Sequence, residues 1–386
     1  MGSDGGAEQP WNPQRQRSAN ERLLLDRLRA AGPASRAQLA RDSGLSKPTV
    51  SSALAALEQA GLVREAGTHS PERGRSAVLY SPDPTAGYAL GIDIGRGWVR
   101  VALADLDATL VARSAVRNDA RTSGVLADLV VGAARALVER SGIDPGRLTH
   151  AVVGTPGIFD EESRRVRHAR NLPGWGRPGL ADRIGAGLGL PTAFHNDANL
   201  AALGEYTFGA GASSRLFLYL MVGTGLGMGV VSEGRLFTGA RGGAGEIGFL
   251  PWPGRTRPDA EAVVSAEGVV AAAREYGMTG PLSASDVFDA ARARVPAALK
   301  AVEAEGENLA LIVASAAAVL DPDLVVLGGG VGKSADLLLP VLRRTLRTLG
   351  PLRPKVVAGA LAEDAVLMGA VATALDAARD MAFQRR

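Results

Sequence analysis

The segment SRAQLARDSGLSKPTVSSALAALEQAG, residues 35–61, predicts two short helices separated by a glycine turn. Ser35 is followed three residues later by Gln38, a spacing that matches a capping box at the start of the first helix. Ser46 is suited to cap the second helix, and Pro48 is tolerated in its first turn, where the missing N–H has no helical acceptor. This arrangement is typical of a helix-turn-helix, whose second helix enters the major groove of DNA.

The expected second helix has one apolar face and one polar face. Val50, Leu54 and Leu57 recur at helical spacing and predict the buried face. Polar side chains gather near its N-terminus, where a recognition helix meets DNA. We expect major-groove contacts from Lys47, Thr49, Val50 and Ser52, and phosphate contacts from Arg36 and from the helix start at Ser46.

The flanking residues complete a winged helix. Residues 21–31 predict a preceding helix, and residues 62–64 and 77–80 predict two short strands around the polar loop THSPERGRS. Arg73 and Arg75 lie at the tip of this loop, where arginines suit the negative potential of a narrow minor groove. A solvated charged loop is the alternative interpretation.

Composition limits the classes of protein to which the chain can belong. The 386 residues include no cysteine, which excludes disulfides and thiolate metal sites and favours a cytoplasmic location. We expect no signal peptide and no association with a membrane, because no apolar run approaches the length of a span. Residues 1–80 hold 11 Lys and Arg against 8 Asp and Glu, so the net charge of +3 lies entirely in the part with the helix-turn-helix.

From Tyr88 the pattern changes to strands that alternate with helices, which predicts a two-lobed α/β body. Pro82 and Pro84 mark the linker. The predicted organisation is a mobile tail at 1–17, the winged helix at 18–82, a first lobe at 83–195 joined by a C-terminal helix at about 366–386, and a second lobe at 196–365.

Glycine and carboxylate residues are concentrated in a few segments of this body. They are GIDIGRG at 91–97, GTPGIFD at 154–160, HNDANLAALGE at 195–205, VGTGLGMGVV at 222–231, GARGGAGEIGF at 239–249 and LDPDLVVLGGGV at 320–331. The loop around Gly223 and Gly225 suits phosphate oxygens or a plain β-turn. Asn196 and Asp197 suit a helix cap or a polyol site, and Glu246 suits a ligand hydroxyl or solvent.

The order and wording of these segments resemble the ROK family of repressors, open reading frames and sugar kinases. The resemblance implies an actin-like, ribonuclease-H-like two-lobed fold behind the winged helix, with a sugar or sugar derivative bound between the lobes. Asp197 matches the catalytic base position of the kinase members. By position, the implied ligand-binding residues are Asn196, Asp197, Glu246 and Glu267, with Gly157 and Asn171 nearby.

Two departures from the family pattern bear on function. Kinase members usually show Asp-x-Gly-Gly-Thr-Lys in the first phosphate loop, whereas Arg96 and Gly97 here replace the second glycine and the threonine. Many members follow AGEIG with a histidine and three cysteines that bind zinc. Phe249 and the stretch at 250–268 offer none of these ligands, so we predict no structural zinc and no cofactor.

These observations favour a non-catalytic regulator, most simply a repressor. It would bind double-stranded operator DNA as a homodimer or tetramer and respond to the sugar-type effector. Asp197 keeps open the alternative of an ATP-dependent sugar kinase with a fused DNA-binding domain. The loss of the family histidine at Phe249 motivates a third hypothesis, in which the body binds no ligand and serves only for dimerisation.

Overall fold

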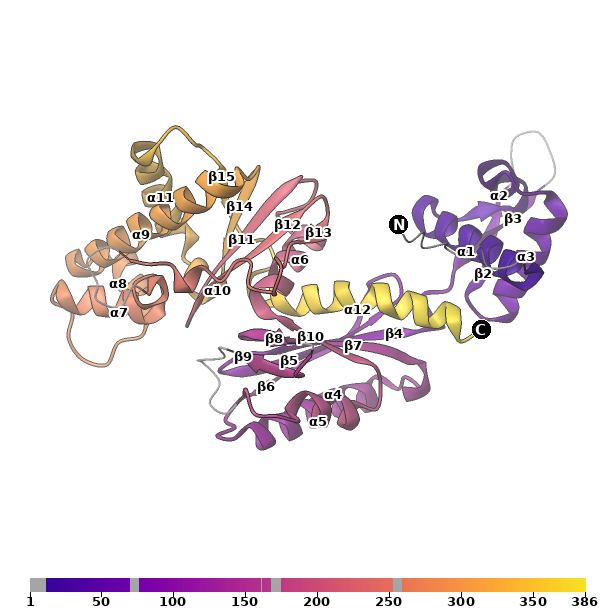
Figure 1. Cartoon of the computed structure of the whole chain (residues 1–386), viewed down its shortest axis with the longest axis horizontal. Coiled ribbons are helices and arrows are strands. Elements are labelled where there is room, and N and C mark those ends of the chain that lie inside the picture. Colours follow the sequence, from indigo (N-terminus) through magenta and orange to yellow (C-terminus); the bar gives the residue numbers. More distant parts are fainter. Residues whose placement is uncertain (1–11, 70–75, 161, 168–174, 253–258) are drawn as a thin grey trace, which may run out of the picture. The chain divides into compact units, whose positions relative to one another are not determined.

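The structure, a computed structural model, describes residues 12–69, 76–160, 162–167, 175–252 and 259–386 (Figure 1). It divides into two compact units. The first unit comprises the residues up to Tyr88, the turn Asp105–Thr109 and the C-terminal residues Ala377–Arg386. The second unit comprises Ala89–Ala104 and Leu110–Asp376.

The first unit is a winged helix. Its strands pair in the order β1-β3-β2, and β2 and β3 form the antiparallel hairpin of the wing. The elements are α1 (Pro13–Ala31), β1 (Ala34–Ser35), α2 (Arg36–Ser43), α3 (Lys47–Gln59), β2 (Val63–His69), β3 (Ala77–Pro82) and the short 3-10 turn η1 (Pro84–Ala86). The two-residue strand β1 was not expected from the sequence; Ala34 and Ser35 pair with Tyr80 and Leu79.

The start of α1 corrects one expectation. The helix begins at Pro13 and not at residue 21, because the Asn12 side chain accepts a hydrogen bond from the Gln14 amide and proline occupies the first turn. Residues 13–17 are therefore helical and do not belong to the expected tail. Residues 1–11 of that tail lie outside the described part of the chain.

The N-caps expected for α2 and α3 form, but the capping box expected at Ser35 is incomplete, because no hydrogen bond from the Ser35 amide to the Gln38 side chain is present among the described residues. The Ser35 side chain accepts from the Gln38 amide at 3.3 Å, and the Ser46 side chain accepts from the Thr49 amide at 3.3 Å. Gly44 ends α2 in the left-handed region, with φ of 71°. The side chains that share the core of this unit are fully buried: Leu24, Leu25, Leu28, Leu39, Val50, Leu54, Leu57 and Tyr80.

The first lobe of the second unit is built on a five-stranded sheet with the order β10-β7-β4-β5-β6. Helices α4 and α5 pack together and cover one face of this sheet (Figure 1). A separate two-stranded ribbon is formed by β8 and β9. The elements are β4 (Tyr88–Ile94), β5 (Trp98–Asp105), β6 (Leu110–Arg117), α4 (Ser123–Ser141), η2 (Pro145–Arg147), β7 (Leu148–Thr155), β8 (Ile158–Asp160), β9 (Arg165–Arg167), α5 (Leu180–Leu188) and β10 (Thr192–Asn196).

The second lobe is built on a second five-stranded sheet, with the order β13-β12-β11-β14-β15. Helices α7, α8, α9 and α11 pack on one another at one side of this sheet (Figure 1). The elements are β11 (Leu216–Val222), β12 (Leu226–Ser232), β13 (Arg235–Leu236), η3 (Ile247–Phe249), η4 (Ala260–Ala262), α7 (Ala266–Glu275), α8 (Ala284–Arg292), α9 (Pro296–Leu320), β14 (Leu324–Gly328), α10 (Gly329–Gly332), α11 (Ala335–Leu349), β15 (Lys355–Ala358) and η5 (Ala362–Asp364).

Two helices, α6 (Asp197–Phe208) and α12 (Ala365–Gln384), cross where no side chain fits between them. A Cβ atom on Gly204 would lie 2.2 Å from the Ala365 carbonyl oxygen. A Cβ atom on Gly369 would lie 1.7 Å from the Leu200 carbonyl oxygen. Glycine is therefore required at both positions, and the backbones of the two helices touch directly. Because α6 also packs on β11 and β12, this crossing links the two lobes.

Glu205 fixes the end of α6 to the loop that leads into α12. Its side chain is 0% exposed. One carboxylate oxygen accepts from the amides of Ala210 at 2.9 Å and Ala360 at 3.1 Å, and the other accepts from the amide of Leu361 at 2.8 Å. The buried carboxylate thus accepts hydrogen bonds from three backbone amides, in the role that carbonyl oxygens have in helices and sheets.

None of the helices in the described ranges is both long enough and apolar enough to span a bilayer.

Candidate functional site

The N-terminal turn of α3 presents polar side chains to solvent, as expected for a recognition helix. Ser46, Lys47 and Ser52 are exposed, and Thr49 is half-buried. The hydroxyl oxygens of Ser46 and Thr49 lie 2.8 Å apart and share a hydrogen bond. The Ser46 hydroxyl is therefore used for capping, while Lys47 and Ser52 offer donors to a partner surface.

Val50 corrects the expected set of DNA contacts. Its side chain is 0% exposed and packs in the core of the first unit. It lies on the same helical stripe as Leu54 and Leu57, so the orientation that buries these two also buries Val50. Val50 cannot reach a base edge from that position.

Arg36 is exposed, and its guanidinium lies 4.9 Å from the centre of the Tyr80 ring. This cation–π contact orients the side chain at the start of α2, where we expect a phosphate contact. Arg73 and Arg75, the expected minor-groove contacts, lie outside the described residues.

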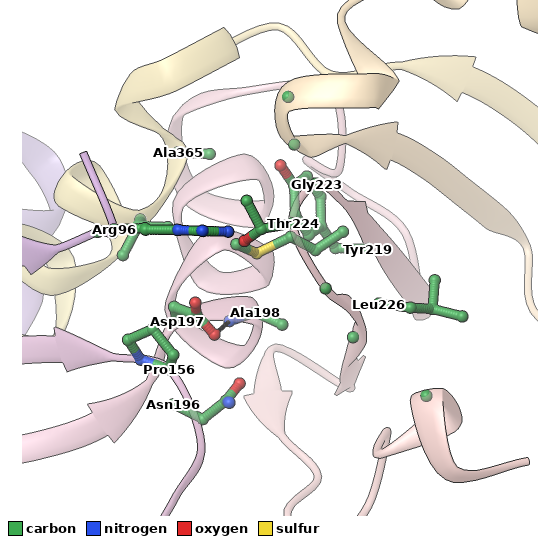
Figure 2. A pocket seen from close by; sticks show the side chains of 18 of the residues that line it. Arg96, Pro156, Asn196, Asp197, Ala198, Tyr219, Gly223, Thr224, Leu226 and Ala365 are labelled. Atoms are coloured by element: carbon green, nitrogen blue, oxygen red, sulfur yellow. Dashed lines mark hydrogen bonds between the residues drawn. The ribbon is translucent and has the colours of Figure 1, made fainter. Parts of the chain in front are cut away.

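The second unit contains a cavity of about 390 Å³ between its two lobes (Figure 2). The first lobe contributes the turn between β4 and β5, and the second lobe contributes the turn between β11 and β12. Of the expected ligand-binding residues, those that line the cavity are Gly157, Asn196, Asp197 and Glu246. Asn171 lies outside the described residues.

Glu267 does not line this cavity, which corrects a second expectation. It lies in the first turn of α7 and is exposed. Glu261 lines the cavity instead, and its carboxylate accepts from the Leu226 amide at 3.1 Å. The two glutamates stand on either side of Ser265, the N-cap of α7. The capping serine was the available signal, because it places Glu267 inside α7 and leaves Glu261 before the helix, in the 3-10 turn η4.

Asn196 is held at the cavity wall by hydrogen bonds at both ends of its amide. Its oxygen accepts from the Asn199 amide at 3.0 Å and so caps α6, as its sequence context predicts. Its nitrogen donates to the Gly157 carbonyl at 3.1 Å. Gly157 has φ of 90°, a conformation that favours glycine. These contacts rigidly place the start of α6, and with it Asp197.

Asp197 and Glu246, two carboxylates of the cavity, have raised pKa values because they are desolvated. Burial raises the pKa of Asp197 to about 6, although one oxygen accepts from the Ala198 amide at 2.8 Å. Burial, followed by the charges of Asp197 and Glu261, also raises the pKa of Glu246. Several acidic groups therefore share a confined space, which suits hydrogen bonds to the hydroxyl groups of a ligand.

A chain of ion pairs crosses the other end of the cavity. Arg100 on β5 contacts Asp93 at 3.3 Å and Glu363 at 2.8 Å, and Glu363 also pairs with Lys333. Burial raises the pKa of Asp93 to about 7, while Arg100 opposes this rise. No local sequence pattern marks Arg100, Lys333 or Glu363, because these residues meet only after the chain has folded.

Trp98 also escaped sequence reasoning and lines the cavity beside Arg96. Its ring lies 5.5 Å from the Arg117 guanidinium. Among the described residues, no group of three or more histidine, aspartate and glutamate side chains has the arrangement of a metal site. Residues 253–258, which belong to the stretch that replaces the family cysteines, are outside that description.

Comparisons with known proteins find one family model in each of the two compact units. Residues 17–64 match a model of winged helix-turn-helix DNA-binding segments, and residues 89–377 match the model of the ROK family. A xylose repressor of Bacillus spizizenii is 29% identical over 61% of this chain. The aligned part spans only 60% of that repressor's length.

A glucokinase of Halalkalibacterium halodurans is 32% identical over 66% of this chain and 84% of its own length. One solved structure, a ROK family transcriptional regulator described as a homologue of the E. coli MLC protein, superposes with a TM-score of 0.78. That likeness covers 96% of this chain and 98% of the other at 21% identity, and it shows a shared fold. With the family model matched over most of its length, this chain belongs to the ROK family and joins a winged helix to the sugar-kinase-like fold of that family.

Proposed function

We propose that the chain is a transcriptional repressor that binds operator DNA through its first unit and responds to a sugar-type ligand in the cavity of its second unit. The observation that carries this proposal is the exposed polar start of α3 on a fully packed three-helix core. A sugar kinase has no use for such a surface. The match of this segment to winged helix-turn-helix models and the named repressor among the relatives support the same conclusion.

DNA recognition in this proposal uses Lys47, Thr49 and Ser52 in the major groove and Arg36 on phosphates, with Arg73 and Arg75 in the minor groove. The protein acts in the cytoplasm, and the functional form is a homodimer or tetramer, because one winged helix reads only a short half-site. The DNA-binding domain spans about residues 18–82, and the lobes span about 83–195 with the C-terminal helix, and 196–365.

Helix α12 supports a route from ligand to DNA. It begins at the cavity, which Ala365 and Val366 line. Its last residues belong to the first unit, where Asp380 pairs with Arg22 of α1. A ligand that favours one angle between the lobes would shift this helix and thereby change the population of DNA-competent protein.

The test is a footprint of the full-length protein on the DNA immediately upstream of its own reading frame, at several salt concentrations. We expect protection that weakens steeply with salt, because phosphate contacts release counterions. Lys47→Ala should weaken binding by roughly tenfold or more. Lys355→Ala, which changes an exposed lysine on β15, is the matched control and should bind normally. Equal binding by the two variants would contradict the assigned recognition surface.

We also propose that the chain is not an enzyme. Kinase activity is the second candidate, because Asp197 lies in the cavity with a pKa near 6, a value that suits a general base. The replacement of a phosphate-loop glycine by Arg96 favours the regulator. Hexose-dependent consumption of ATP that disappears in Asp197→Asn would overturn this part of the proposal. The absence of heat in calorimetry with every sugar would instead favour the ligand-free dimerisation hypothesis.

A further inference from the structure

The turn η5, which leads directly into α12, is joined by ion pairs to the sheet of the first lobe. Its Glu363 carboxylate pairs with the Arg100 guanidinium of β5, with 2.8 Å between Oε2 and Nη2. Its neighbour Asp364 pairs with Arg113 of β6 at 3.1 Å. Both members of the second pair are well exposed, so that pair contributes little, whereas the Arg100 side chain is only 19% exposed. The pair of Arg100 and Glu363 is therefore the stronger link from the first lobe to the start of α12.

Glu363 also holds a cation of the second lobe. Its other carboxylate oxygen contacts the ammonium group of Lys333, which directly follows α10. Both cations contact the same carboxylate, so they lie close enough to repel each other. Desolvation lowers the pKa of Lys333, and the charge of Arg100 lowers it further. Glu363 is thus the anion that allows one cation from each lobe to approach the same point.

The same side chains form part of the cavity wall. Arg100, Lys333 and Glu363 all line the cavity. Asp93 of β4 lines it too and pairs with Arg100 at 3.3 Å. Ala365, the first residue of α12, lies at the same cavity (Figure 2). A ligand in the cavity therefore meets both the ion pairs and the start of the helix whose last residues belong to the first unit.

We propose that Arg100, Glu363 and Lys333 form a latch that sets the angle between the two lobes and passes changes in that angle to α12. With the latch intact, each lobe contributes one cation to Glu363, and the attraction holds η5 against both lobes. Without the charge of Glu363, the two cations face each other, and their repulsion drives the lobes apart. This inference rests on the proposed repressor function for its effect on DNA, and it names how the response of the cavity is regulated.

The test measures the distance between the lobes by double electron–electron resonance of two nitroxide labels. The chain has no cysteine, so the labels can be attached through Arg140→Cys on α4 and Glu307→Cys on α9, two exposed positions in different lobes. We expect a single narrow distribution of distances for this labelled protein. The addition of Glu363→Gln should shift the distribution to longer distances and broaden it.

Glu303→Gln is the matched control for the labelled protein. It breaks an ion pair with Arg344 at 2.8 Å that has similar exposure but lies entirely within the second lobe. The control should leave the distribution unchanged. The latch is rejected if Glu363→Gln gives the same distribution as Glu303→Gln.

Two further measurements separate repulsion from a general loss of structure. The combination of Glu363→Gln with Lys333→Gln should return the distribution toward that of the intact latch, because only one of the two cations remains. Salt at about 1 M screens charges beyond about 3 Å. It should broaden the distribution when the latch is intact and narrow it in Glu363→Gln. The salt measurement on the intact latch does not depend on the folding of any latch variant. No return in the double variant, or a salt effect of the same sign in both proteins, would overturn the inference.

Footprints of the same variants test the connection to α12. The operator affinity of Glu363→Gln should differ by about fivefold or more from that of Glu303→Gln. Equal affinities despite a changed distance between the lobes would reject the connection. The distance measurement uses neither DNA nor ligand, so it can reject the latch while the footprint of the unsubstituted protein still supports a repressor. If that protein gives no footprint, the repressor function fails, and the distances still test whether the latch sets the angle.

Discussion

Removal of the charge of Glu205 should loosen the joint between α6 and α12. The carboxylate is fully buried and accepts three backbone hydrogen bonds, from Ala210, Ala360 and Leu361. Gln has one acceptor oxygen. If that oxygen keeps the two amides that share Oε2, the NH₂ group faces the Leu361 amide, so two donors oppose each other.

The expected cost follows from these contacts. Glu205→Gln loses one charge-assisted hydrogen bond and weakens two others to neutral ones, and each hydrogen bond to a charged group contributes about 1.5–3 kcal/mol. We therefore expect a loss of about 3 kcal/mol in the free energy of local opening. That loss corresponds to roughly a hundredfold faster exchange of the affected amides.

Hydrogen exchange read by mass spectrometry measures this effect locally. Peptides that cover residues 205–211 and 358–364 should exchange faster in Glu205→Gln, while peptides of the first unit should not change. Glu307→Gln, at an exposed position of α9, is the matched control. If these peptides exchange at the same rate in Glu205→Gln and in Glu307→Gln, the Glu205 carboxylate does not hold the end of α6 to the loop before α12, and the reasoning is refuted.

Three further predictions follow from single contacts. Burial raises the pKa of Glu305 well above its ordinary 4.5, so the wild type loses stability as pH rises above about 4.5. Glu305→Gln should not lose stability over this pH range, so its urea midpoint should exceed that of the wild type at pH 8. Urea midpoints of the two proteins that change in parallel with pH would contradict this prediction. Gly369→Ala should prevent proper folding, because its Cβ would lie 1.7 Å from the Leu200 carbonyl oxygen. Gly97→Ala is the control, because there is open space around its new Cβ, and it should give soluble protein with a normal circular dichroism spectrum. Ser46→Ala should remove the cap of α3, lower the stability of the winged helix by about 1 kcal/mol and weaken operator binding in a gel shift; unchanged melting and binding would show that the cap contributes nothing.

Local signals in the sequence were sufficient for much of the fold. The caps at Ser35 and Ser46 and the turn at Gly44 form as expected, because each depends on groups within three or four residues of one another. The hairpins around GIDIGRG and VGTGLGMGVV also form where the glycines predict them. Helix starts were less accurate: α1 begins at Pro13, whereas the sequence indicated a helix only over 21–31.

Placement of side chains at the sites depended on contacts that no local pattern contains. Val50 was expected both in the core and on DNA, and only its packing decided for the core. The choice between Glu261 and Glu267 followed from where α7 begins.

The sequence by itself determined the order of domains, the helix-turn-helix, the family and the positions of the glycine-rich turns, because these depend on short-range chemistry and on motifs that are contiguous in the chain. The tertiary structure alone decided which carboxylates share the cavity, how far burial raises their pKa values, and which cations there already have partners. Arg100 and Glu363 are separated by 263 positions, and their ion pair exists only because the folded chain brings β5 next to the loop before α12. Desolvation and pairing of this kind are properties of a three-dimensional environment, so they leave no mark in the sequence near either residue.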